Sequence, residues 1–190
     1  KWHLGEYKDD YMPYNRGYEI FTGFPHGGRQ SYSPEIMVEK KWQVADGEYT
    51  CDLLTNYAMK YIEEMDPRKT GKPFLLSLHF WAPHANVSFH EGMEPKYKGR
   101  SWLPMKEIDL RYGDTLNVKF PYPDFPNLDS ALLNRMIREY HSSVHSVDRN
   151  VGRLIEFLEG NDLLNNTFIV FTSDHGYMSG HNGLWHKGRG

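Results

Sequence analysis

The sequence has little cysteine, no excess of basic residues and no long hydrophobic run. Cys51 is the one cysteine among 190 residues, so an internal disulfide is excluded. The 22 lysines and arginines face 25 acidic residues, and the resulting net charge of −3 excludes a strongly basic nucleic-acid-binding surface. No segment approaches the run of about 18 apolar residues that spans a membrane. Hydrophobic residues still make up 39% and aromatic residues 15%, which is enough for a folded core.

Both ends of the sequence interrupt patterns that are typical of folded structure. The chain begins with Lys1-Trp2-His3 rather than with methionine, and it stops at Gly190 directly after a polar motif. No internal repeat divides the residues between these ends. We therefore expect residues 1–190 to be an internal part of one longer domain.

Two segments have the apolar spacing of amphipathic helices. Apolar side chains recur at helical intervals over residues 49–65, and Pro67 ends this pattern. The same spacing begins near Ser130, a residue that can cap a helix, and continues to Gly160. The sequence therefore predicts two helices, the second about twice as long as the first.

Short apolar runs alternate with these helices. Residues 73–80 and 168–171 are nearly continuous apolar runs, which is typical of strands buried on both faces, and residues 1–5 resemble the end of another strand. Residues 6–48 and 81–128 show little periodicity and are predicted to be mainly loops. The alternation predicts an α/β fold with a largely parallel sheet flanked by helices.

Polar, titratable residues lie at the end of each of the three predicted strands. Lys1 and His3 lie in the first, His84 follows the second, and Asp174 and His175 follow the third. Because ligands bind at the carboxyl ends of strands in open α/β sheets, these residues indicate one shared site. On a strand, Lys1 and His3 would share a face and could bind an anion. The alternative is a surface lysine and a packing histidine.

Asp174, His175 and Gly176 have the composition of half a cation site. Asp supplies a hard oxygen ligand, His supplies an imidazole, and Gly allows a close backbone turn. The alternative is an aspartate that caps the following turn. His141 and His145 have the spacing of zinc ligands, but no glutamate lies between them, so we interpret them as solvated or packing residues. We interpret His79 as a core residue.

Several motifs occur in a recognisable order. They are Lys1-Trp2-His3-Leu4-Gly5, Ala82-Pro83-His84, Ser173-Asp174-His175-Gly176 and Gly183-Leu184-Trp185-His186-Lys187-Gly188, with supporting similarity in residues 14–21 and 147–154. In this order the sequence resembles the formylglycine-dependent (type I, arylsulfatase-like) sulfatases of the alkaline phosphatase superfamily. The resemblance covers the whole chain. It implies that residues 1–190 are an internal part of a single sulfatase catalytic domain, with the nucleophile segment before Lys1 and further residues after Gly190.

The resemblance implies a calcium-assisted hydrolysis of sulfate esters in the complete protein. Lys1 would contact the sulfate and the nucleophile, and His3 would act as a base that assists breakdown of the sulfated hydrate. His84 would bind sulfate and protonate the leaving oxygen, and Lys187 would hold a sulfate oxygen. Each fixed cation near the ester anion is worth about 4 kcal/mol of attraction at an effective dielectric constant of 20.

The resemblance also implies the cofactors. Asp174 and His175 would be two of the ligands of a Ca²⁺ ion. The formylglycine, made from a Cys or Ser in a Cys/Ser-x-Pro-x-Arg motif, is expected upstream of Lys1, because none of the eleven prolines has Cys or Ser two residues before it. The Asp-Asp pair that supplies the other calcium ligands in the family is expected upstream as well. We therefore expect the 190-residue chain alone to be inactive.

Two departures and two alternatives remain. Ala85 follows the Ala-Pro-His motif where the family often has Thr or Gln before a proline, and His181 is displaced by one position, so its role is left open. A phosphonate monoesterase or phosphodiesterase would use the same scaffold, and a catalytically silent binding protein could retain it. The joint presence of all six candidate residues favours an enzyme.

The resemblance also bears on partners and location. A sulfated small molecule or a sulfated carbohydrate is the expected substrate, with no nucleic acid and no membrane span. A secreted, periplasmic or lysosomal location is expected. Which sulfate ester is hydrolysed does not follow from the sequence.

Overall fold

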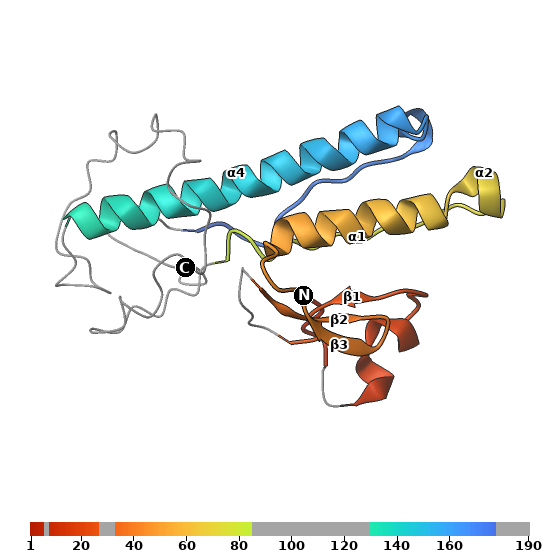
Figure 1. Ribbon diagram of the computed structural model, residues 1–190, viewed down its shortest axis with the longest axis horizontal. Coiled ribbons are helices and arrows are strands. Elements are labelled where there is room, and N and C mark those ends of the chain that lie inside the picture. The colour runs from red at the N-terminus through yellow and green to blue at the C-terminus, as the bar shows by residue number, and fades with distance from the viewer. Residues whose placement is uncertain (6–7, 27–32, 85–129, 178–190) are drawn as a thin grey trace.

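The computed structural model describes residues 1–5, 8–26, 33–84 and 130–177, with Tyr140 the one described side chain of residues 130–142. Two helices lie side by side above a small sheet, and extended chain returns along each helix (Figure 1). The elements in chain order are η1 (Asp9–Tyr11), η2 (Pro13–Asn15), β1 (Thr22–Gly23), β2 (Glu35–Val38), β3 (Lys41–Val44), α1 (Thr50–Glu64), α2 (Pro67–Thr70), α4 (Ser130–Gly160) and η5 (Leu164–Asn166).

The sheet is antiparallel, with the order β1-β2-β3. Met37 pairs with Trp42, and Val38 pairs with Lys41 across a two-residue hairpin turn. The turn residues Glu39 and Lys40 both have positive φ values, 48° and 71°, as a tight hairpin that follows the twist of its strands requires. The prediction of mainly loop over residues 6–48 is therefore wrong for these strands. The turn has none of the Gly, Asn or Asp residues that identify such hairpins in a sequence.

A compact apolar core joins the sheet to α1. Phe24 and Ile36 from the sheet region pack against Leu53 and Leu54 of the helix, and all four side chains are buried. Fully burying one such side chain contributes about 1.5–3 kcal/mol. The sheet is therefore fixed to the helix by packing as well as by its own hydrogen bonds.

Both predicted helices are present. Helix α1 ends at Glu64, close to the predicted end, and helix α4 ends at Gly160 as predicted. Asp66 begins the short helix α2, where its side chain accepts a hydrogen bond from the Arg68 amide at 2.9 Å. Gly71 ends that helix in the left-handed conformation, with a φ of 68°, which glycine adopts at little cost.

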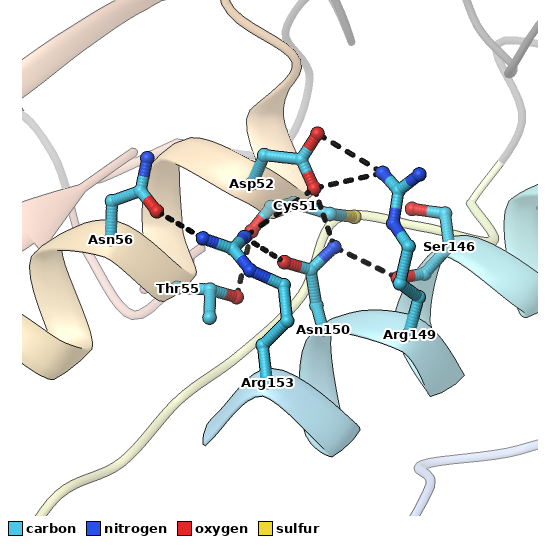
Figure 2. A network of polar contacts seen from close by, with 8 residues as sticks. All are labelled: Cys51, Asp52, Thr55, Asn56, Ser146, Arg149, Asn150 and Arg153. Atoms are coloured by element: carbon cyan, nitrogen blue, oxygen red, sulfur yellow. Dashed lines mark hydrogen bonds and ion pairs between the residues drawn. The ribbon is translucent and has the colours of Figure 1, made fainter. Parts of the chain in front are cut away.

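A polar network clamps α4 to α1 (Figure 2). Asp52 on α1 accepts hydrogen bonds from Arg149 at 3.0 and 3.1 Å and from the Asn150 side chain at 2.7 Å. Arg153 donates to Asn150 at 2.8 Å and to Asn56 at 2.7 Å. The side-chain amide of Asn150, which is fully buried, also donates a hydrogen bond to the Ser146 carbonyl at 2.9 Å. The network fixes the relative register of the two helices, because its partners lie on both.

The segments predicted as buried strands are extended, but the prediction of burial on both faces is wrong. In residues 74–80 the side chains alternate between half-buried and exposed, with Leu75 82% exposed and His79 also on the exposed side. In the second segment, Phe168 is 93% exposed and Phe171 75%. Neither segment pairs as a strand with another of the described residues. The helices cover one face of residues 74–80, and no described residue covers the other. The interpretation of His79 as a core residue is wrong for the same reason.

Residues 1–5 do not form a strand either. His3 has a φ of 59°, in the left-handed region, so the alternation that would place Lys1 and His3 on one strand face is interrupted. The segment is held instead by single hydrogen bonds from the Trp2 amide to Phe24 at 2.7 Å and from the His3 amide to Pro25 at 2.8 Å. The parallel sheet stays a prediction, since the described strands form an antiparallel one.

Candidate functional site

Two of the predicted anion-binding side chains meet at one aromatic ring. The Lys1 ammonium lies 5.3 Å from the centroid of the Trp81 ring, and the His84 ring stacks on Trp81 with centroids 4.6 Å apart. The planes of the two rings differ by 27°. Trp81 itself is only 4% exposed. An ammonium and an imidazole therefore lie on the same buried ring, at the end of the extended segment that precedes His84.

His3 is placed differently from its strand-based prediction. Its side chain is exposed, and its backbone is fixed by the hydrogen bond to Pro25. The structure therefore brings Lys1 and His84 together through Trp81, whereas His3 points to solvent from the neighbouring position.

Asp174 and His175 form a local pair at the end of the second extended segment. An oxygen of the Asp174 carboxylate lies 3.4 Å from Nε2 of His175, and the other accepts a hydrogen bond from the His175 amide at 2.9 Å. The Asp174 side chain is 76% exposed. This arrangement fits half of a cation site, because it offers a carboxylate and an imidazole close together. Within the described residues no cluster of three or more His, Cys, Asp or Glu side chains completes it.

The two extended segments end over the same helix. Ala82 and Val147 of α4 both pack against the buried pair Tyr49 and Cys51, and Tyr177 contacts Tyr140 of α4 with ring centroids 5.2 Å apart. Tyr140 and Val147 are seven residues apart, so they lie on one face of the helix and about 10 Å apart along its axis. The segment that ends at His84 and the segment that carries the Asp174 pair therefore reach neighbouring parts of one helix face.

A buried polar cluster lies beneath the segment that carries His84. Tyr49 and Cys51 are buried and pack against Phe80 and Ala82, with the hydroxyls of Ser143 and Ser146 beside them. Burial raises the pKa of the Cys51 thiol and that of the Tyr49 phenol above their usual values. Both groups are therefore neutral at physiological pH. Cys51 is therefore placed as a buried packing residue and not as a nucleophile.

The remaining candidates are outside the site or outside the described residues. His145 is exposed on α4, in agreement with its interpretation as a solvated residue, whereas the side chain of His141 is not among those described. Lys187 and His181 lie outside the described residues. Sequence reasoning missed Trp81, which is the centre of the arrangement. The available signal was its position directly before the Ala82-Pro83-His84 motif.

Comparisons with known proteins identify the family of the chain. The sulfatase family model matches residues 1–190. Human iduronate 2-sulfatase is 30% identical over 152 residues, which cover 70% of this chain and 26% of the relative. An N-acetylglucosamine-6-O-sulfatase from Bacteroides thetaiotaomicron is 27% identical, over 98% of this chain and 43% of the relative. The chain thus spans less than half the length of these curated relatives.

Solved structures show the same fold. The structure of BT4656 with its substrate D-glucosamine-2-N,6-O-disulfate superposes with a TM-score of 0.60 and 21% identity, over 90% of this chain and 46% of that one. The structure of Ps i-CgsB with a neocarrahexaose gives a TM-score of 0.56 and 21% identity, over 87% and 34%. At this identity the likeness concerns the fold alone.

The chain thus combines the cationic side chains of Lys1 and His84 with an Asp-His pair at the end of the second extended segment. It belongs to the sulfatase family, whose model matches its full length. This confirms the family resemblance, and the solved neighbours are consistent with an α/β fold. Among the described residues, no helix is long and apolar enough to cross a membrane.

Proposed function

We propose that the complete protein hydrolyses sulfate esters, with a sulfated carbohydrate as its substrate class. The observation that carries the proposal is the meeting of Lys1 and His84 on Trp81, in a chain of the sulfatase family. Two relatives and one solved neighbour are named for sulfated sugars, which supports the choice of a carbohydrate ester.

In this proposal, each candidate residue of the chain has a role in the hydrolysis. Lys1 and Lys187 hold the oxygens of the sulfate group and stabilise the negative charge that develops on them during transfer. His84 holds the same group and donates a proton to the leaving oxygen. His3 acts as the base that accepts a proton when the sulfated nucleophile breaks down. A formylglycine upstream of Lys1 would supply the hydrated aldehyde oxygen that attacks sulfur.

A Ca²⁺ ion is the cofactor that this proposal includes. Asp174 and His175 would hold it, because a carboxylate is the ligand that a hard cation prefers and the imidazole lies beside it. The further oxygen ligands would come from residues outside the described ones. When bound, Ca²⁺ would add positive charge next to the sulfate oxygens.

The test is a comparison of esters with the complete protein. We expect the wild-type enzyme to hydrolyse 4-nitrophenyl sulfate faster than the matched phosphate and phosphonate esters, and to hydrolyse glucosamine 6-sulfate as well. Faster hydrolysis of the phosphorus esters would favour the phosphodiesterase or phosphonate monoesterase alternative. Binding of all these esters without turnover would favour the silent binding protein.

A leaving-group series separates the two roles assigned to cations. The deficit of His84→Ala should grow as the pKa of the leaving alcohol rises, because assistance by a general acid matters more for poor leaving groups. The deficit of Lys187→Ala should stay nearly constant, on the order of 10²–10³ in rate, because a fixed charge stabilises transfer from every ester. Equal slopes for the two variants would remove the acid role from His84.

A further inference from the structure

Trp81 combines burial with contacts to charged or chargeable side chains. Its indole is almost completely buried, yet two cationic or potentially cationic side chains, Lys1 and His84, contact its ring. They come from segments about 80 residues apart in the sequence. The ring is therefore the point at which two distant parts of the chain meet.

The Lys1 ammonium needs a restraint beyond its fixed backbone in order to occupy one defined position. Its backbone is fixed by the neighbouring hydrogen bonds of Trp2 to Phe24 and of His3 to Pro25. Four rotatable bonds still separate that backbone from the ammonium, so many positions are open to the charge. The face of an indole attracts a cation within about 6 Å of its centre, and the ammonium lies 5.3 Å from it.

His84 is bound to the same residue in two ways. Its amide donates a hydrogen bond to the Trp81 carbonyl at 3.0 Å, which closes a tight turn over Ala82 and Pro83. Its ring then stacks on the indole, with centroids 4.6 Å apart. The turn fixes the backbone, and the stack fixes the direction of the imidazole.

The backbone around Trp81 is held by packing against the start of α1. The residues on either side of it, Phe80 and Ala82, pack against the buried pair Tyr49 and Cys51 at the start of α1. The backbone of Trp81 is therefore fixed relative to the start of α1, and its 4% exposure leaves the ring little room to move. The negative face of the ring also offsets part of the repulsion between two cations that face one anion.

We propose that Trp81 is a positioning residue of the sulfate-binding site, which holds the Lys1 ammonium and the His84 imidazole at the separation that one sulfate group requires. This inference rests on the proposed function and names a residue that acts through two others. Trp81 does not contact the reacting atoms in this proposal. Its contribution is the geometry of the two cations before the ester arrives.

The test uses the complete protein and two readouts, binding of inorganic sulfate by calorimetry and turnover of 4-nitrophenyl sulfate. Trp81→Leu keeps an apolar side chain but removes the aromatic face. We expect it to bind sulfate about tenfold more weakly and to lose on the order of 10²-fold in kcat/KM, because misplaced groups lose that much. Trp81→Phe keeps an aromatic face and should recover most of both. Trp42→Leu removes an indole from the exposed strand β3 and is the matched control, with both readouts unchanged.

A double-mutant cycle distinguishes positioning from general stability. Trp81→Leu should cost much less sulfate affinity when Lys1→Ala or His84→Ala is already present, because Trp81 acts through those side chains. Full additivity in both cycles, or wild-type sulfate affinity in Trp81→Leu, would overturn the inference. If Trp81→Leu does not fold, Trp81→Phe in the same cycles decides, since even its smaller deficit must shrink in the two backgrounds.

The two proposals fail in different ways. A wild-type protein that binds sulfate but hydrolyses no sulfate ester overturns the proposed function, and the sulfate affinities of the variants then decide on Trp81. A wild-type protein that binds no sulfate overturns the positioning role as well.

Discussion

Two regions of the chain differ in how their apolar residues are covered. One is the sheet together with α1, and the other consists of the two extended segments, residues 72–84 and 167–177. The first region has its own core, where Phe24 and Ile36 are buried against the helix. The extended segments are as apolar in sequence, yet Leu75 and Phe168 are mostly exposed. The candidate site residues His84 and Asp174 lie at the ends of the extended segments. The packed core is therefore in one region and these candidate site residues are in the other.

The difference follows from how far apart the strand partners are. Strands β2 and β3 pair across two residues, so a short stretch of chain contains both partners. Parallel strands need a crossover of a dozen residues or more, and their partners lie far away in sequence. A local pair therefore forms wherever its residues are present, whereas an apolar extended segment is covered only when distant residues reach it.

Substitutions of phenylalanine should show the largest contrast. Phe24→Ala should lower the free energy of unfolding by about 3–5 kcal/mol, because it opens a cavity in the core. Phe168→Ala in the same 190-residue chain should change it by less than about 0.5 kcal/mol, because the side chain is exposed. Urea unfolding of both variants measures this. Equal losses would show that Phe168 is covered, and the comparison of regions would fail.

A change at Asp174 should affect function without affecting stability. In the complete protein, Asp174→Ala should weaken calcium binding and reduce sulfatase activity on the order of 10²-fold, because a charged ligand and the charge it holds are lost together. The thermal midpoint without added calcium should stay the same, because the side chain is exposed. Calorimetric titration with calcium checks the ligand role, and wild-type affinity would contradict it.

The clamp between α1 and α4 should have an intermediate effect. Asn150→Ala removes three hydrogen bonds from a fully buried side chain and should cost about 1–3 kcal/mol of stability. Arg149→Ala removes a more exposed contact to the same Asp52 carboxylate, so it should cost no more than about 1 kcal/mol. Chemical denaturation of the pair gives the ranking. A larger loss for Arg149→Ala would place the strength of the clamp at its exposed edge.

Acid should lower the free energy of unfolding by protonating Asp66, the residue that begins helix α2. The hydrogen bonds from the Arg68 side chain, and then from its amide, lower the pKa of the Asp66 carboxyl to about 2. Because the folded-state pKa is below the unfolded value of about 4, the stabilisation is present above pH 4 and is lost as the pH falls towards 2. Urea unfolding between pH 5 and 2 should show this loss in the wild type. Asp66→Asn should lack that part of the pH dependence, and identical profiles would contradict the prediction.

The smallest effect should come from the exposed ion pair on α1. Lys60 lies 3.7 Å from Glu64, one helical turn away, and both side chains are about half exposed. Lys60→Ala should change stability by less than about 0.5 kcal/mol, because solvent screens such pairs. The same unfolding assay at low and high salt detects it. A loss comparable to that of Asn150→Ala would show that surface charge, not the buried network, holds this helix.

The helices were predictable because their signal is local. The apolar spacing around Leu53 and Leu54 recurs every three or four residues, and it predicted α1 to within a residue or two at each end. The end of α4 at Gly160 was predicted from the same spacing. The hairpin at Glu39 and Lys40 was not predictable, because residues of this type rarely adopt the left-handed conformation and do so here only within the folded sheet.

The candidate site was predictable in part. The family motifs identified Lys1, His84, Asp174 and His175 as candidate site residues. Their roles remain predictions. Their arrangement was not given by strand alternation, since the positive φ of His3 interrupts the extended backbone and the His3 side chain is exposed. The position of Trp81 directly before the Ala82-Pro83-His84 motif was visible in the sequence, but its contact with Lys1 was not, because about 80 residues separate the two.

The sequence by itself determined the family and the two long helices, because motifs and helical spacing are properties of neighbouring residues. Only the tertiary structure decided which apolar faces are covered and which cations meet. Burial and side-chain contact depend on residues far apart in the chain, such as Lys1 and Trp81 or Asp52 and Asn150. Such contacts form only when packing brings their segments together, and no local pattern encodes that distance.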